Sequence, residues 1–210
     1  TYKPKRIEEY LYKFICEINE LLYKGSIIEK IHFSIKIKAF ICDTPARSYL
    51  KCVKGHMSFD GCERCHVKGE KHKNTTVFLD THCKKRTDTE FRNFTDVDHH
   101  TGVSALIYVE PNINMINHFV LDPMHLFDER IMKRLLDFWI CHKNIKLSIM
   151  ESSELDRRTN LIRKWIPYEF DRKFRSTKHF EKYKAAEYKF FLLYCGPIVL
   201  KCILDDFKYN

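Results

Sequence analysis

The stretch Phe40-Ile41-Cys42-Asp43-Thr44-Pro45-Ala46-Arg47 marks the point where an apolar strand gives way to a helix. Apolar residues alternate with lysines from Ile35 onward, which predicts a strand up to Cys42 that is half-exposed at its start and buried at its end. Threonine followed by proline suits the first positions of a helix, so we predict a short helix through about Cys52. The strand therefore ends on Asp43, at the edge where α/β sheets expose side chains for binding and catalysis.

Helical periodicity is found on both sides of this stretch. Apolar residues recur every three to four positions in the ranges 6–24 and 123–142, and Gly25 closes the first of these patterns. A charged stretch predicts a further helix through Trp165, and a last helix is expected over 177–193 before the break at Gly196-Pro197. The fold class predicted from these patterns is a helix-rich mixture of helices and strands, α/β or α+β.

Residues 54–102 differ in character from the rest of the chain. They are rich in Gly, Asp, Asn, Thr, charged residues and histidine, with one short strand-like run over 75–79. Such a segment has too few apolar residues for a core of its own, and we predict an irregular insertion held together by a ligand. Its Cys62-x-x-Cys65 spacing lets two thiolates of one tight turn bind a single Zn²⁺, although a redox pair or two free thiols would have the same spacing.

The charge of the chain favours a polyanionic partner. Lysine and arginine outnumber acidic residues 37 to 28, which gives a net charge of +9. Nucleic acid is the leading candidate, and a mildly basic soluble protein is the alternative. No apolar run approaches the roughly 18 residues that span a bilayer, and the sequence opens without a signal peptide, so we expect a soluble, intracellular protein. Most of its nine cysteines stand singly in apolar segments, as expected for reduced thiols.

Two acidic residues are candidates for a catalytic role. Asp43 can hold a divalent metal at the edge of the sheet, or it can cap the helix that follows. Glu187 lies on the last predicted helix beside two alanines and near several aromatic residues. The alternative interpretation is that Glu187 is an ordinary solvent-exposed glutamate on a helix.

Taken together, these motifs resemble the transposases of CACTA/En-Spm elements, in particular an animal lineage of this family. The resemblance covers nearly the whole chain, and the order and spacing of its motifs make it specific. The matching strings are Phe40–Arg47, Lys54-Gly55-His56, Gly61-Cys62-Glu63-Arg64-Cys65, Leu121-Asp122-Pro123-Met124-His125 and Phe191–Pro197. The family has an RNase H-like nuclease with a DDE/D triad, and the related V(D)J recombinase catalytic subunit has a zinc-binding Cys-x-x-Cys after its second aspartate.

The resemblance assigns roles to individual residues. Asp43 matches the second catalytic acid and Glu187 the third. The implied structural zinc ligands are Cys62, Cys65, His125 and one further histidine. For that fourth ligand His100 is preferred because it lies in His-His-x-Gly, and His118 is the alternative.

The resemblance also implies a partial RNase H-like fold with a large zinc-binding insertion. Its expected parts are residues 1–53 of the core, an insertion over 54–165, and a C-terminal helical part of the core over 166–210. The three acids of the family hold two Mg²⁺ or Mn²⁺ ions that drive attack on a DNA phosphodiester. The first acid has no counterpart in this chain, so we expect a fragment of a nuclear transposase that is inactive alone.

The expected partner is the DNA of transposon ends, and the chain is a possible homo-oligomer with no membrane role. The alternative function is a transposon-derived, zinc-stabilised module that binds DNA or protein without catalysis.

Overall fold

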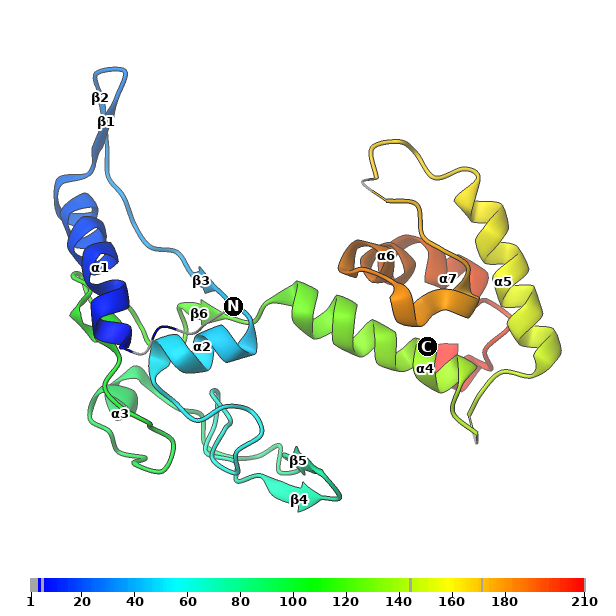
Figure 1. Cartoon of the computed structure of the whole chain (residues 1–210), viewed down its shortest axis with the longest axis horizontal. Helices are drawn as coiled ribbons and strands as arrows, with labels where there is room; N and C mark the ends of the chain where they lie inside the picture. Colours follow the sequence, from blue (N-terminus) through cyan, green and yellow to red (C-terminus); the bar gives the residue numbers. More distant parts are fainter. Residues whose placement is uncertain (1–3, 5, 144, 171, 210) are drawn as a thin grey trace. The chain divides into compact units, whose positions relative to one another are not determined.

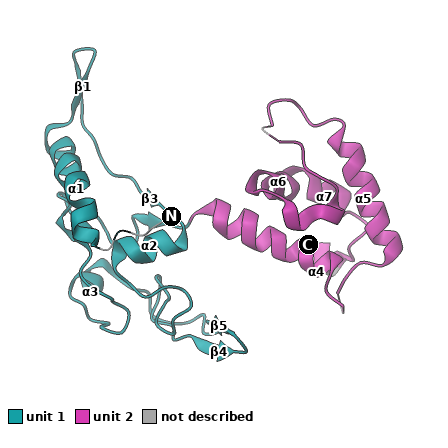
Figure 2. Ribbon diagram, viewed as in Figure 1, with its two compact units in different colours: residues 1–121 teal, residues 122–210 magenta. Residues whose placement is uncertain are grey.

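The computed structural model describes residue 4 and residues 6–143, 145–170 and 172–209. The chain forms two compact units, unit 1 (Thr1–Leu121) and unit 2 (Asp122–Asn210) (Figure 2). Each unit has its own apolar core. Helices are combined with short two-stranded sheets, which confirms the helix-rich α+β class. The RNase H-like arrangement and the zinc-binding insertion stay predictions. Within the described ranges, no helix is both long and apolar enough to cross a bilayer.

Unit 1 combines helical segments with short strands (Figure 1). Its helices are α1 (Ile7–Lys24), α2 (Thr44–Lys51), α3 (Asp88–Arg92) and the 3-10 helix η1 (Ala105–Tyr108). Its strands are β1 (Ser26–Ile28), β2 (Ile31–Phe33), β3 (Phe40–Ile41), β4 (Glu70–His72), β5 (Thr75–Val77) and β6 (Phe119–Val120). The pairs β1–β2 and β4–β5 are antiparallel hairpins, whereas β3 and β6 pair in parallel across a separation of more than seventy residues in the chain.

Helix α1 confirms the first predicted helix almost to the residue. Its apolar positions fall on one face, which buries Ile7 and Leu11 in the core of unit 1. The helix ends at Gly25, which has a positive φ of 71°. A Cβ at this position would lie 2.3 Å from the backbone oxygen of Phe33. Glycine is therefore required both for the conformation and for the close approach of β2.

The central strand is shorter than the sequence predicts. A strand was expected from Ile35 to Cys42, but β3 holds only Phe40 and Ile41 because its partner β6 offers two residues for pairing. The ring of Phe40 stacks on that of Phe119 with the centroids 4.9 Å apart. The short helix after the strand is confirmed as α2.

Unit 2 is helical in all the elements that the structure assigns to it. These elements are the π-helix η2 (Met124–Met132), α4 (Lys133–Ile140), α5 (Ile149–Arg163), the 3-10 helix η3 (Thr177–Lys182), α6 (Ala185–Phe190), the π-helix η4 (Phe191–Cys195), α7 (Gly196–Val199) and α8 (Asp206–Tyr209). Segments η2 and α4 run on from each other and confirm the helix expected over 123–142. Their buried side chains Met132 and Leu136 pack in one cluster with Leu155 and Phe191.

The division of the chain differs from the boundaries expected at 53/54 and 165/166. Val53 belongs to the same buried cluster as Phe91, and Leu155 to the same cluster as Ile166, so both expected boundaries fall inside a core. The structure divides the chain once, after Leu121. The helix over 123–142 therefore lies in unit 2. The division into core and insertion stays a prediction.

The helix expected over 177–193 is interrupted. The 3-10 helix η3 ends at Lys182, and a new helix begins after Lys184. The backbone N–H of Lys184 donates to Glu187 Oε2 at 2.8 Å, which is the contact that starts α6. An acidic side chain three positions into a helix can therefore restart it, and this feature is not visible in the apolar periodicity.

Candidate metal centre

The two cysteines of the Cys62-x-x-Cys65 turn lie close together as free thiols, with their sulfurs 3.4 Å apart. The turn is held by antiparallel pairing of Cys65 with Lys85, and Arg86 N–H donates to the backbone oxygen of Arg64 at 2.9 Å. Two sulfurs bound tetrahedrally to one Zn²⁺ at 2.3 Å would lie about 3.8 Å apart. The donor pair therefore fits half of a zinc site. Burial raises the pKa of the Cys65 thiol, so a bound metal would have to displace its proton.

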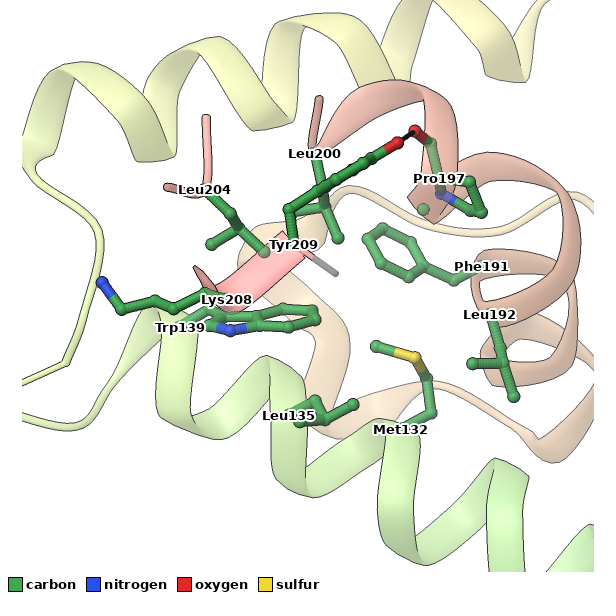
Figure 3. Close-up of a pocket in the computed structure, with 11 residues that line it drawn as sticks. Met132, Leu135, Trp139, Phe191, Leu192, Pro197, Leu200, Leu204, Lys208 and Tyr209 are labelled. Carbon is green, nitrogen blue, oxygen red and sulfur yellow. Dashed lines mark hydrogen bonds between the residues drawn. The ribbon is translucent and has the colours of Figure 1, made fainter. Parts of the chain in front are cut away.

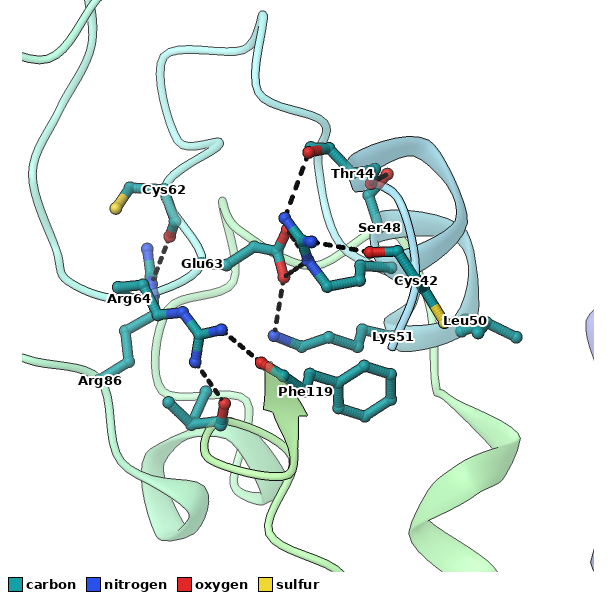
Figure 4. A network of polar contacts seen from close by, with 12 residues as sticks. Cys42, Thr44, Ser48, Leu50, Lys51, Cys62, Glu63, Arg64, Arg86 and Phe119 are labelled. Atoms are coloured by element: carbon teal, nitrogen blue, oxygen red, sulfur yellow. Dashed lines mark hydrogen bonds and ion pairs between the residues drawn. The ribbon is translucent and has the colours of Figure 1, made fainter. Parts of the chain in front are cut away.

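Glu63, between the two cysteines, ties this turn to helix α2 (Figure 4). Its carboxylate is paired with Arg47 Nε at 3.2 Å and with Lys51 Nζ at 3.3 Å. The Lys51 side chain is fully buried, and its ammonium lies 5.5 Å from the centroid of the Phe119 ring. Burial lowers the pKa of Lys51, while Glu63 opposes the shift. Since Arg47 Nη1 also donates to the backbone oxygen of Cys42, the residue after β3, at 2.9 Å, one ion cluster joins the end of this strand, α2 and the cysteine turn.

Two further arginines of the irregular segment donate to backbone carbonyls. Arg64 donates to the carbonyl of Ile116 at 2.6 Å and to that of Phe119. Arg86 Nε donates to the carbonyl of Cys62 at 2.9 Å, and its Nη1 is 2.7 Å from Asp96. Guanidinium groups thus supply much of the cohesion that the few apolar residues of 54–102 cannot. Arg86 is buried and engaged in these bonds, so it is not free to contact a phosphate.

The histidines proposed as zinc ligands have different surroundings. The ring of His100 lies against Phe91 and Phe94, and its Nδ1 is buried without a hydrogen-bond partner. His118, the alternative fourth ligand, accepts a hydrogen bond from the Asn114 backbone N–H at its Nδ1, 3.1 Å away. This contact occupies one of its two possible ligand atoms.

His125 lies in unit 2, where Asp122 Oδ2 is 2.5 Å from its Nδ1. A carboxylate on one ring nitrogen is the arrangement that commonly orients a metal-ligating histidine. This contact lowers the pKa of Asp122. A shared metal with the cysteine turn of unit 1 stays a prediction.

Asp43 acts as the N-cap of α2 in the structure. Its Oδ1 accepts the Ala46 backbone N–H at 2.7 Å, which is the capping contact that the sequence left open as the alternative to a metal site. Asp43 lies two residues past the end of β3, whereas the predicted strand ran up to it. Its catalytic role stays a prediction.

Glu187 is fully buried and its carboxylate is surrounded by donors. Oε1 accepts from Arg175 N–H and Nε, each at 3.1 Å, and Oε2 accepts from Arg175 Nη2 at 2.8 Å in addition to Lys184 N–H. A metal at this carboxylate would have to replace the Arg175 contacts. Arg175 had been missed in the sequence because nothing in the spacing of residues 175 and 187 signals an ion pair between a loop and a helix. The meeting of Asp43 and Glu187, which lie in different units, stays a prediction.

Unit 2 also contains an apolar hollow of about 290 Å³ (Figure 3). Met132, Trp139 and Phe191 line it, together with further aliphatic side chains. Its polar neighbours are already paired, because Tyr209 hydroxyl donates to the Pro197 carbonyl at 2.6 Å and Lys208 pairs with Asp205. The hollow can accept an apolar group but offers no acid–base chemistry.

In the part of the chain that the structure describes, no three His, Cys, Asp or Glu side chains already lie together as a complete metal-ligand set. The cysteine turn is therefore the one predicted pair of ligands whose donor atoms are seen in contact in that part of the chain. Comparisons of the chain with protein-family models, with curated proteins and with solved structures give no match.

Proposed function

We propose that this chain is a segment of a CACTA/En-Spm-type transposase that works in the nucleus, binds DNA and does not cleave it alone. The observation that carries the proposal is the pair of free thiols of Cys62 and Cys65, 3.4 Å apart and tied by Glu63 to the helix that Asp43 caps. This pairing supports a zinc-stabilised segment attached to the strand that bears the family's second acid. A structural Zn²⁺ there would fix the backbone of a segment that is poor in apolar residues.

Exposed lysines of the same segment supply a surface for phosphates. Lys71 on β4, Lys73 in the following turn and Lys85 beside the cysteine turn are all exposed to solvent. Neutralising phosphates with lysine releases counterions, so the binding should weaken steeply with salt. Contacts of this kind carry no base specificity by themselves.

The test is fluorescence-anisotropy titration of a DNA duplex at several salt concentrations. Lys71→Glu/Lys73→Glu/Lys85→Glu should lower affinity at least tenfold and flatten the salt dependence. Lys13→Glu/Lys143→Glu/Lys146→Glu is the control, since it changes net charge equally through exposed lysines elsewhere. Equal losses in both triple variants would mean that only overall charge matters and would remove the proposed surface.

A second candidate is the nuclease itself, with Asp43 and Glu187 as two of three carboxylates around two Mg²⁺ or Mn²⁺ ions. The placement of Asp43 after a parallel strand favours it, because such strand ends commonly carry catalytic residues. In that role the two carboxylates would position the ions, which would activate the attacking oxygen and stabilise the leaving one. Supercoiled plasmid nicking by the pure chain, abolished by Asp43→Asn, would favour this candidate over a DNA-binding segment.

A further inference from the structure

A small enclosed cavity lies beside the cysteine turn, inside unit 1. Its volume is about 10 Å³, close to the space that one water molecule or one metal ion requires. The residues that line it are His66, Arg86, Glu90, Phe91, Asp96, His99 and His100. Three imidazoles and two carboxylates thus line a space for a single small occupant, although these described side chains do not already lie together as a metal-ligand set.

Two buried nitrogen atoms of this cavity have no partner. His99 is fully buried, and neither its Nε2 nor the Nδ1 of His100 makes a hydrogen bond. Leaving a buried polar atom without a partner costs about 1–3 kcal/mol, so such atoms indicate a missing occupant. The ring of His99 is held at its other nitrogen, because Nδ1 is 2.6 Å from the backbone oxygen of Asp60.

That contact fixes the chemistry of the unpartnered atom. A carbonyl oxygen only accepts hydrogen bonds, so Nδ1 of His99 must carry the proton and donate it. In a neutral imidazole, Nε2 then presents a lone pair toward its surroundings. The occupant must therefore be a cation or a hydrogen-bond donor, and an anion is excluded at this atom.

Two carboxylates among the lining residues can act as further ligands. Glu90 is paired with Lys84 and Asp96 with Arg86, so both of their charges are already balanced. Each carboxylate lies near the His66 ring, at 3.5 Å from Nε2 and 3.6 Å from Nδ1, which is longer than a good hydrogen bond. His66 is therefore loosely held and is the member best able to turn toward an ion.

The spacing of the two unpartnered rings matches that of two ligands on one ion. The centroids of His99 and His100 lie 5.6 Å apart. Two imidazoles bound tetrahedrally at about 2.0 Å have centroids about 5 Å apart. A donated Nδ1–H on a backbone carbonyl is also the usual second contact of a metal-bound histidine.

We propose that this cavity binds one transition-metal ion of the Zn²⁺ class through His99 Nε2 and His100 Nδ1, with His66 and Asp96 completing the coordination. The site is separate from the thiols of Cys62 and Cys65 and does not depend on the DNA-binding proposal. It assigns His100 to a histidine site rather than to the zinc of the cysteine turn. Imidazole and carboxylate ligands suit Zn²⁺, Co²⁺ and Ni²⁺ alike.

The test is titration of the metal-free protein with Co²⁺, followed by absorption spectroscopy and metal analysis. Thiolate ligands give an intense charge-transfer band that imidazole and carboxylate ligands do not give. The full chain should bind two equivalents. Cys62→Ser/Cys65→Ser should keep one equivalent and lose the band, whereas His99→Gln/His100→Gln should keep one equivalent together with the band. His56→Gln/His72→Gln is the control and should leave both sites intact.

Imidazole NMR of the unmodified chain gives a second test that does not depend on whether the variants fold. Zn²⁺ should shift the Nε2 resonance of His99 while its Nδ1 stays protonated. The proposal is overturned if the chain binds a single equivalent, if the histidine variant also loses the thiolate band, or if Zn²⁺ leaves His99 unshifted. The last result would mean that the cavity holds water.

Discussion

Residues 54–102 of unit 1 and the helices of unit 2 are ordered by different interactions. In and around 54–102 the buried groups include Arg86 and the Lys51 that faces this segment, and they are held by carboxylates and backbone carbonyls. In unit 2 the fully buried groups are mostly apolar, such as Leu136 and Phe191. Order in the first region rests on directional charge pairs, and in the second on apolar surface removed from water.

This difference predicts how each region loses stability when it is mutated. A charge network loses stability sharply when one partner is removed, because the other is left buried and unpaired. An apolar core loses stability in proportion to the volume deleted. The predictions below separate these two behaviours, from the largest expected effect to the smallest.

Removing metal should have the largest effect and should be confined to unit 1. We expect Cys62→Ser/Cys65→Ser, or chelation of the native protein, to cost several kcal/mol, since structural Zn²⁺ contributes about 10–16 kcal/mol in small zinc-dependent peptides. Peptide-resolved hydrogen exchange should show faster exchange over 54–102 with unit 2 unchanged. The matched control is Cys16→Ser/Cys202→Ser, in which both thiols are exposed. Unchanged exchange in 54–102 after metal removal would show that the arginine contacts alone order this segment.

Glu63→Gln should be the most damaging single substitution in the charge network. It leaves Arg47 and Lys51, with side chains 6% and 0% exposed, facing a neutral amide. Removing one member of a buried ion cluster costs about 3–5 kcal/mol, and we expect the lower end because the amide still accepts hydrogen bonds. Chemical denaturation measures the loss. Glu70→Gln on the exposed strand β4 should change stability by less than about 0.5 kcal/mol.

Much of the local structure could be predicted from the sequence, whereas the contacts between distant segments could not. The periodicity of α1 and the strand-to-helix junction at Asp43 are local signals, and both were recognised. The division after Leu121 depends on which apolar faces meet, and periodicity does not specify partners. His99 was grouped only with its neighbour His100, since its burial and its contact with the Asp60 carbonyl depend on chain segments 39 residues apart.

Glu187→Gln should cost less than Glu63→Gln, although Glu187 is the more deeply buried carboxylate. Its partner Arg175 has a side chain 36% exposed and can return to water when the pair is broken. We expect the free energy of unfolding to fall by about 2 kcal/mol. Hydrogen exchange should become faster around α6 and stay unchanged over 54–102. Glu154→Gln is the control, because its pairs with Arg157 and Arg158 are at the surface and should contribute less than about 1 kcal/mol. An unchanged free energy of unfolding for Glu187→Gln would indicate that the carboxylate has a role other than stabilising the fold.

The smallest effect is expected at Asp43, where stability and chemistry can be separated by two substitutions. Asp43→Ala removes the acceptor for the Ala46 N–H and should cost about 1 kcal/mol, the usual contribution of an N-cap. Asn caps helices as well as Asp does, so Asp43→Asn should leave the free energy of unfolding within about 0.3 kcal/mol of the original while removing the charge that a metal ion requires. Calorimetric titration with Mn²⁺ then measures metal binding separately from stability. If Asp43→Asn is stable but loses a Mn²⁺ site that the original chain has, the carboxylate has a role beyond capping. If both proteins bind Mn²⁺ equally or not at all, Asp43 in this chain serves the start of α2 and nothing more.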